Sequence, residues 1–114
     1  IMKPILIVSP WFTNLVSIVI DVYAITLFPF IISKEEMGAE TLNHETIHIY
    51  QQRELLLIGF YVLYFYYYLR GLVKYKDKQK AYYMIPFEQE AYEYDNQLDY
   101  LETRKPYSWT KYKV

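Results

Sequence analysis

His44-Glu45-Thr46-Ile47-His48 contains both histidines of this chain, and its HExxH spacing is the strongest indication of the fold. On a helix, residues four apart lie on one face with Cβ atoms roughly 5–6 Å apart, so two imidazoles can bind one metal ion. Glu45 then lies beside the open side of the metal, where it can take a proton from a zinc-bound water. The motif predicts an active-site helix with His44 and His48 as zinc ligands and Glu45 as catalytic base. A chance match on an ordinary amphipathic helix is the alternative.

The third zinc ligand has to be a carboxylate. A catalytic zinc usually has three protein ligands and a water, and the chain has no cysteine and no further histidine. The metzincin pattern HExxHxxGxxH is excluded, because Gln51 stands at its glycine position and Glu54 at its last ligand position. A helix that runs on past Gln51 carries Glu54 about 15 Å along its axis from His44. A Glu or Asp from another element must therefore supply the third ligand.

The best donors lie between Ile85 and Asp95, where Pro86 followed by acidic residues predicts the first turn of a new helix. At 100° per residue one face of this helix holds Glu88, Ala91, Tyr92 and Asp95, whereas Glu90 and Glu93 point elsewhere. The small Ala91 would let this helix approach the HExxH helix closely. Acidic residues in a first turn also complement the helix dipole, so the pattern alone does not single out Glu88.

HETIHIYQQ at 44–52, followed about forty residues later by PFEQEAY at 86–92, resembles the gluzincin clan of zinc peptidases. Within that clan the chain most resembles the minigluzincins, small soluble proteins similar to the catalytic domains of membrane-embedded zinc proteases. The resemblance covers Ile25 to about Tyr94. It implies a zinc cofactor, a peptide or protein substrate, and Glu88 as third ligand on a "glutamate helix".

Three further positions bear on this resemblance. The larger membrane relatives have an aspartate where this chain has Tyr92, so the supporting role of that aspartate cannot be transferred. Gln51 matches the HExxHxxQ form of similar proteins, and with Gln52 it is a candidate for hydrogen bonding to a zinc ligand. Clan members usually add a donor for the oxyanion, but among fifteen tyrosines the sequence does not identify one.

Outside the motifs, residues from Ile25 to Ile32 are rich in β-branched and aromatic types, which predicts a strand, and Pro29 predicts that it lies at a sheet edge. In the gluzincin clan an edge strand before the active-site helix holds an extended peptide; a strand that merely closes the domain is the alternative. Leu15 to Tyr23 is expected to form a partner strand. A helix is expected from near Glu40 to about Leu69.

Composition limits the remaining options. With 114 residues, 54% hydrophobic, we expect one domain spanning 1–114 and no large core. The net charge of −1 gives no electrostatic basis for nucleic-acid binding. Leu55 to Leu69 is uncharged but shorter than the roughly 20 residues needed to span a bilayer. Contact of its tyrosine-rich face with a membrane surface is the less favoured alternative. The lysines between 74 and 80 predict a solvated loop, and the absence of cysteine agrees with a cytoplasmic location.

These observations predict an α+β, zincin-like minimal domain with a small sheet or hairpin, a long active-site helix and a C-terminal glutamate helix. The expected function is zinc-dependent peptide-bond hydrolysis, with His44, His48 and Glu88 as metal ligands and Glu45 as catalytic residue. The aromatic tail after Pro106 could cover the cleft and make the protein latent, as in zymogens, or dock only for stability. A non-catalytic zinc-binding scaffold and a soluble piece of a membrane-embedded zinc protease are the alternatives.

Overall fold

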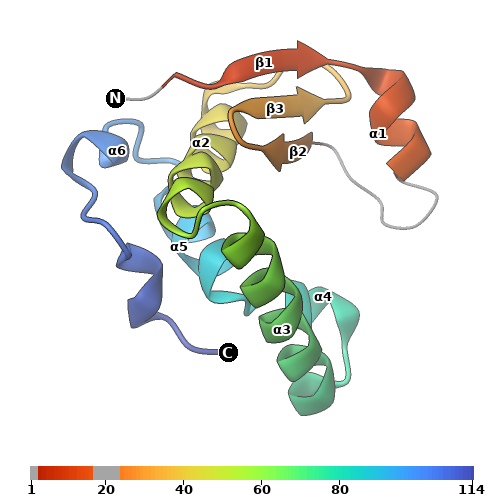
Figure 1. Cartoon of the computed structure of the whole chain (residues 1–114), viewed down its shortest axis with the longest axis vertical. Coiled ribbons are helices and arrows are strands. Elements are labelled where there is room, and N and C mark those ends of the chain that lie inside the picture. The colour runs from red at the N-terminus through yellow and green to blue at the C-terminus, as the bar shows by residue number, and fades with distance from the viewer. Residues whose placement is uncertain (1–2, 17–23) are drawn as a thin grey trace.

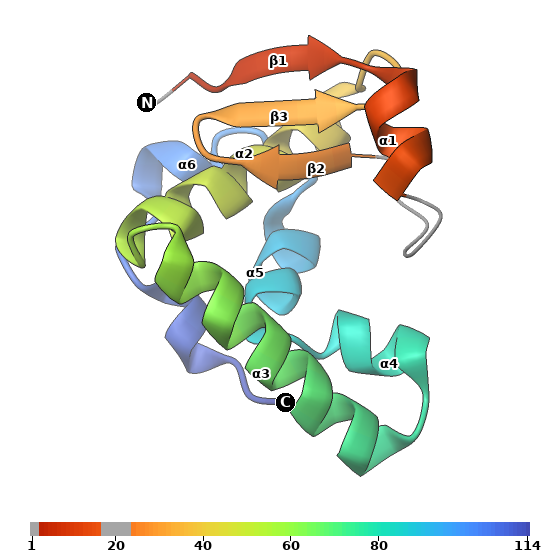
Figure 2. The same cartoon turned by 45° about the vertical axis from the view of Figure 1, so that its right-hand side comes forward.

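A small sheet and the helix that follows it frame an α+β fold in this computed structural model, which describes residues 3–16 and 24–114 (Figure 1). The sheet lies over α2, and α3 and α4 lie on the side of α2 away from the sheet (Figure 2). The elements, in chain order, are β1 (Ile5–Val8), α1 (Pro10–Val16), β2 (Ala24–Leu27), β3 (Phe30–Ser33), α2 (Ala39–Glu54), α3 (Ile58–Tyr75), α4 (Lys78–Tyr83), α5 (Pro86–Tyr94), α6 (Tyr100–Thr103) and the short 3₁₀ helix η1 (Ser108–Lys111).

The sheet has the order β1-β3-β2, with β1 parallel and β2 antiparallel to β3. The prediction of one strand from Ile25 to Ile32 is wrong, because Phe28 and Pro29 form the turn of a hairpin. Pro29 has no N–H to donate to a sheet, and the turn places it where none is needed. The edge position that Pro29 predicted therefore holds for β2, whereas β3 lies in the middle of the described sheet.

We expected a partner strand from Leu15 to Tyr23, but the second strand that pairs with β3 is a different segment. Leu15 belongs to α1, and 17–23 lie outside the described residues. The second neighbour is β1, in which Ile5 lies opposite Phe30 and Val8 opposite Ser33. This strand could not be predicted from the sequence, since a parallel pairing between segments so far apart leaves no local pattern.

The expected single helix from about Glu40 to Leu69 is two helices. The start is as predicted, with Gly38 before the first residue of α2. The chain then turns by 112° between α2 and α3, where Leu56 and Leu57 have φ of 54° and 63°. No glycine or proline marks this break. It allows Phe60 to fold back, so that its ring lies 4.6 Å from that of Phe87.

The lysine-rich stretch is mostly helical and not a loop. α3 extends to Tyr75, and α4 begins at Lys78 after Asp77. The Asp77 carboxylate accepts a hydrogen bond from the backbone N–H of Gln79 at 3.0 Å. The two helices cross closely at Gly71, where a Cβ would stand 2.9 Å from Cα of Ala81. An exposed capping residue and a buried glycine thus fix the α3–α4 corner.

The helix from Pro86 is confirmed as α5, with the proline in its first turn. Its two faces enter two buried clusters. Ala91 is fully buried in one with Ile47 of α2, as the prediction of close helix approach required. Phe87 lies in the other with Phe60 and Trp109 of the tail. α5 is therefore held against α2 on one side and against α3 and the tail on the other.

No single helix among the described residues is long and apolar enough to cross a membrane. Only α2 and α3 taken together reach the required length and composition, and they are bent sharply against each other.

Candidate metal centre

α2 places His44 and His48 side by side on its buried face. The two residues are 6% and 5% exposed, and their ring centroids lie 4.9 Å apart. The helix is regular through both residues, so the four-residue spacing brings the imidazoles together as the sequence predicts.

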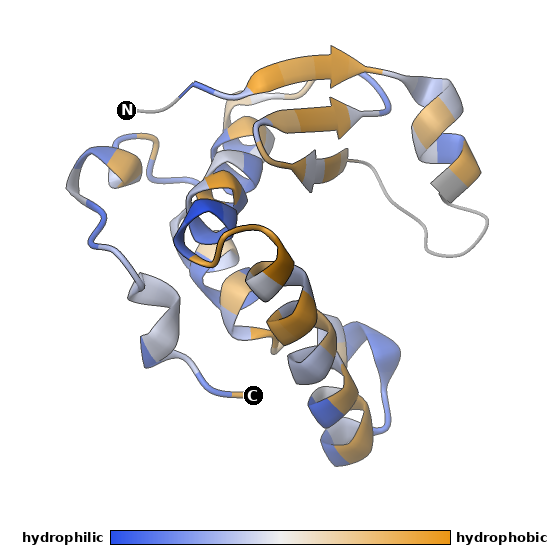
Figure 3. Ribbon diagram, viewed as in Figure 1, coloured by the Kyte–Doolittle hydropathy of each residue, from blue (hydrophilic) through white to orange (hydrophobic). Residues whose placement is uncertain are grey.

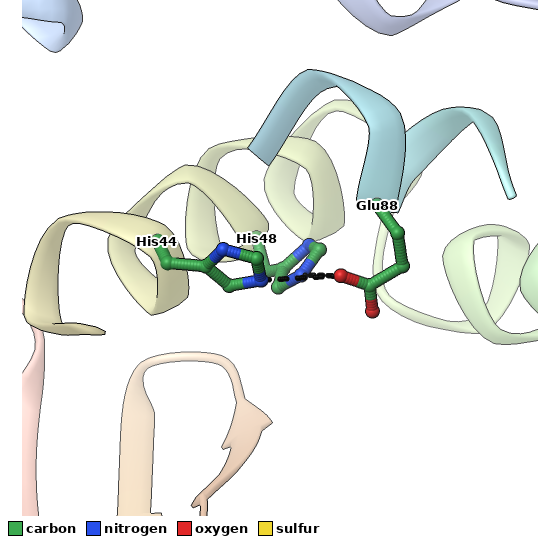
Figure 4. A group of neighbouring side chains, drawn as sticks. All are labelled: His44, His48 and Glu88. Atoms are coloured by element: carbon green, nitrogen blue, oxygen red, sulfur yellow. Dashed lines mark hydrogen bonds and ion pairs between the residues drawn. The ribbon is translucent and has the colours of Figure 1, made fainter. Parts of the chain in front are cut away.

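α5 brings Glu88 to the same place, as Figure 4 shows. Its Oε1 lies 3.1 Å from Nε2 of His44 and 3.0 Å from Nε2 of His48. These distances are close to the roughly 3.3 Å edges of a tetrahedral site with ligand bonds of about 2.0–2.1 Å. The three donor atoms lie within 4.8 Å of one another, and all three residues are buried. This group can therefore hold a metal ion.

The outer ring nitrogens show which atoms face the centre. Nδ1 of His48 lies 2.7 Å from Oε1 of Gln51, and Nδ1 of His44 lies 3.1 Å from Oδ2 of Asp95. The Gln51 oxygen only accepts hydrogen bonds, because the Gln51 amide nitrogen donates to the Phe87 carbonyl, and a carboxylate oxygen such as Oδ2 of Asp95 is likewise an acceptor. Each Nδ1 therefore carries a hydrogen, and a ring without a second proton turns its Nε2 lone pair toward the Glu88 carboxylate.

Two lone pairs and a carboxylate oxygen facing one another need a cation between them. A proton can serve: burial alone would lower the pKa of His48, but the charge of Glu88 and the hydrogen bond to it raise that pKa to about 9. Burial would likewise raise the pKa of Glu88, yet His48 and His44 hold it well below its usual range. A metal ion is the other cation that fits, and it must compete with this proton.

Each metal-facing group has a partner that orients it. Besides Asp95 and Gln51, the Tyr64 hydroxyl of α3 donates to Oε2 of Glu88 at 2.5 Å. Such partners fix the direction of metal ligands. Gln51 was predicted from its spacing to His48, and Asp95 was expected on the Glu88 face with no assigned role. Tyr64 was missed, because no local pattern links a tyrosine of α3 to a glutamate 24 residues later.

Tyr92 occupies the position where the resemblance to larger proteases would put an aspartate. Its ring packs against His44 with centroids 4.4 Å apart, in an edge-on arrangement. Tyr92 therefore covers the His44 ring, whereas the carboxylate that orients His44 comes from Asp95, three residues later.

Glu45 lies next to the centre but outside the group of three donors. Its Oε2 accepts a hydrogen bond from the Thr26 hydroxyl of β2 at 2.5 Å. Burial raises the pKa of Glu45, and the nearby His48, His44 and Thr26 offset part of that effect. The hairpin thus fixes a titratable carboxyl group beside the two histidines.

The competing carboxylates have other partners. Glu90 is buried and accepts hydrogen bonds from Nε of Arg104 at 2.5 Å, from the Tyr100 hydroxyl at 2.6 Å and from the Gln51 side-chain amide at 3.0 Å. Glu54 pairs with the same Arg104 at 2.6 Å, and Glu93 accepts from the Tyr112 hydroxyl. Glu90 and Glu93 point away from the histidines, as predicted.

Gln52 does not touch a histidine, so its expected role beside a zinc ligand is wrong. It accepts from the Phe28 amide and donates to the Thr26 carbonyl, both at 2.7 Å, and the Tyr61 hydroxyl donates to the same carbonyl at 2.6 Å. Side chains of α2 and α3 thus occupy the outer edge of β2 at these positions. This favours the alternative that the strand closes the domain and does not bind a peptide there.

The aromatic tail is docked on α5. Trp109 is 8% exposed and packs on Phe87 at 4.7 Å between ring centroids. The Gln89 amide donates to the Lys113 carbonyl at 2.7 Å, and Lys111 donates to the Tyr94 hydroxyl at 3.1 Å. These contacts complete the core, which is the stability alternative of the sequence analysis. Occlusion of the site by the tail stays a prediction.

Asp95, Gln51 and Tyr64 each form a hydrogen bond with one of the three donor residues, and Thr26 does the same for Glu45. Comparison with protein-family models, with curated proteins and with solved structures found no match for this chain. What the chain does must therefore be argued from these side chains.

Proposed function

We propose that this chain is a zinc-dependent peptidase of the gluzincin type, with a zincin-like fold. His44, His48 and Glu88 would hold the metal, and Glu45 would act as general base and then as general acid. The observation that supports this most is the convergence of two Nε2 atoms on one Glu88 oxygen, with Glu45 fixed beside them. Imidazole nitrogens with one carboxylate oxygen form a common ligand set of catalytic zinc.

When bound there, zinc would polarise a substrate carbonyl and acidify a coordinated water. The chain's own groups would manage the protons. Glu45, which Thr26 orients, would accept a proton during attack on the carbonyl carbon and deliver it to the leaving amine. Tyr64, Gln51 and Asp95 would keep the three ligands aimed at the metal.

Two tyrosine hydroxyls are candidates for binding the carbonyl oxygen of the substrate. Tyr82 and Tyr92 lie with their hydroxyl oxygens 3.0 Å apart, and the Tyr92 ring rests on His44. The Tyr64 hydroxyl also lies beside the ligands, but it already donates to Glu88. In the Tyr82–Tyr92 pair one hydroxyl donates to the other, which leaves the hydrogen of the second free to stabilise the developing charge, so we assign the oxyanion role to this pair.

A non-catalytic metal scaffold is the second candidate, and one observation favours it. The ligand residues are only 4–6% exposed, which suits a closed structural site as well as a catalytic one. A soluble piece of a membrane-embedded protease is the third, and it would use the same ligands. The cytoplasm is the compartment we propose for the peptidase.

Incubation of the zinc-loaded full chain with a library of fluorescence-quenched peptides tests the proposal. We expect cleavage that stops with a chelator, returns with added zinc and is missing in His48→Ala. One bound zinc per chain without cleavage of any peptide would identify a scaffold. Failure to retain any zinc would contradict both functions.

A further inference from the structure

α3 is apolar on two opposite faces. The inner face carries Phe60, Leu63, Tyr64 and Tyr67, which pack on the core around Phe87. The other face carries Ile58, Val62, Phe65, Leu69 and Val73, which we call the outer stripe. Spacings of three and four residues keep the outer stripe on one side of the helix, within about 80° at 100° per residue. Figure 3 shows the apolar colour along α3.

The outer stripe is exposed. Ile58 is 76%, Val62 63%, Phe65 61%, Leu69 43% and Val73 79% exposed. A surface helix of a globular protein normally puts charged residues on its outer face, and a helix that is apolar all round is normally covered. From Ile58 to Leu69 this helix has no charged residue at all. A contiguous apolar stripe of this kind marks a surface that docks on something else.

The chain at the end of α3 is strongly basic. Five cations and one acid lie between residues 70 and 80, namely Arg70, Lys74, Lys76, Lys78, Lys80 and Asp77, so this stretch has a net charge of 5 − 1 = +4 in a chain whose net charge is −1. All six side chains are exposed. α3 itself contains no Asp or Glu, so the outer stripe ends in a positive field without acidic residues of its own.

Apolar and cationic groups meet on one surface at this end. A shallow recess there is lined by Tyr66, Leu69, Arg70, Val73, Lys74 and Val114. The Arg70 guanidinium lies 5.8 Å from the centre of the Tyr66 ring, and the Lys80 ammonium lies 4.5 Å from that of Tyr75. Tyrosine rings that are apolar below and polar at the tip, with cations beside them, are the composition of a membrane–water boundary.

We propose that α3 docks on an anionic lipid surface through the outer stripe, lying in the plane of the interface with its basic end among the headgroups. The helix of 18 residues is about 27 Å long, and an uncharged stripe beside a cationic end is the pattern of interfacial helices. A second copy of the chain could cover the apolar groups, but α3 offers no acidic residue to neutralise the five cations. Anionic lipids supply that charge.

This surface is separate from the metal centre. Tyr64 leaves α3 from the inner face to reach Glu88, whereas the outer stripe points the other way. The diameter of the helix, about 10 Å, therefore lies between the lipid surface and the site. Docking needs neither zinc nor catalysis, so it can be tested whether or not the proposed peptidase activity is found.

Co-sedimentation of the full chain with vesicles tests the proposal. We expect binding to vesicles of phosphatidylcholine mixed with phosphatidylglycerol, weaker binding to phosphatidylcholine alone, and release from the mixed vesicles by high salt. V62E with F65E should lower affinity for the mixed vesicles about tenfold or more, because two apolar side chains that would be buried in the lipid are lost. Each of K76Q and K78Q should lower it about fivefold.

L98E is the matched control, since Leu98 is 61% exposed and lies outside α3, and it should bind like the parent. The substituted side chains are all exposed, so circular dichroism should report an unchanged fold for every variant. Equal binding by the parent and by V62E/F65E would overturn the proposal, as would vesicle binding that survives both high salt and alkaline extraction. A parent dimer that V62E/F65E dissociates, with no binding to vesicles, would show that a second copy covers the outer stripe.

Discussion

Two buried glutamates of α5 are two residues apart in the sequence and face different kinds of cationic partner. Glu88 is 4% exposed and faces two imidazoles, whereas Glu90 is fully buried and faces the guanidinium of Arg104. Burial opposes the charge of each, and in each case the partners outweigh burial and lower the carboxyl pKa. A guanidinium is a permanent cation, so the charge of Glu90 is balanced by Arg104 and needs no added proton or metal ion. Imidazoles become cations only by binding a proton, so the Glu88 group can exchange that proton for a metal ion.

Gln51 connects the two groups. Its side-chain oxygen accepts from Nδ1 of His48 and its nitrogen donates to Oε1 of Glu90. The Glu90–Arg104 ion pair therefore orients the Gln51 amide, which in turn orients the His48 ring. Substitutions on the two sides should separate metal binding from stability.

The largest difference is expected between Glu88→Ala and Glu90→Ala. Glu88→Ala removes the only carboxylate of the donor group, so stoichiometric zinc should be lost in dialysis followed by metal analysis. Glu90→Ala should retain close to one zinc per chain and lose stability, because the buried charge of Arg104 loses one of its two carboxylate partners. Zinc that disappears with Glu90→Ala and persists with Glu88→Ala would reverse our assignment of the two residues.

Arg104→Met should destabilise the fold by about 3–5 kcal/mol, the usual cost of leaving buried charges unpaired. The side chain of Arg104 is 2% exposed, and it pairs with both Glu90 and Glu54. Urea unfolding gives the free energy, and Lys105→Met at the exposed next position is the control. Equal unfolding midpoints for the two variants would mean that the ion pair adds nothing to stability.

The stability of the metal-free protein and its affinity for zinc should both depend on pH. In the protein stripped of metal, the raised pKa of His48, about 9, adds stability below the ordinary imidazole pKa of about 6.5. That contribution is lost as pH rises through 9. Zinc must displace this proton, so its apparent affinity should rise up to about tenfold per pH unit in the same window. Calorimetric titrations across the window check this, and a flat affinity would show that His48 holds no proton to be displaced.

Gln51→Ala and Gln52→Ala provide the finest comparison. Loss of the partner that orients a ligand typically costs about 10–100-fold in metal affinity, and we expect this for Gln51→Ala in competition with a fluorescent chelator. Gln52→Ala should bind zinc like the parent while losing stability, because Gln52 holds the hairpin at Thr26 and Phe28. The reverse order of zinc affinities would contradict the geometry.

The sequence could predict what depends on local spacing. His44 and His48 share a helical face wherever a regular helix forms, and Pro86 begins α5 as its position suggests. The break at Leu56 and Leu57 could not be predicted, since neither residue favours a positive φ and the packing of α3 side chains such as Phe60 on the core is tertiary.

The residues that orient the site also differ in whether local spacing could predict them. Gln51 is three residues from its histidine and was found by its spacing. Tyr64 and Thr26 reach the centre only because α3 folds back and the hairpin lies on α2. These contacts depend on the break and on the Phe28–Pro29 turn, neither of which the sequence predicted.

The most direct test of catalysis compares the parent with Glu45→Gln, both loaded with zinc, in the cleavage of an unstructured peptide. Glu45 lies outside the donor group, so the variant should bind as much zinc as the parent, while the rate falls by roughly 10²–10⁴-fold, the usual contribution of a general base. A variant that holds zinc and cleaves the peptide as fast as the parent would contradict the proposed mechanism.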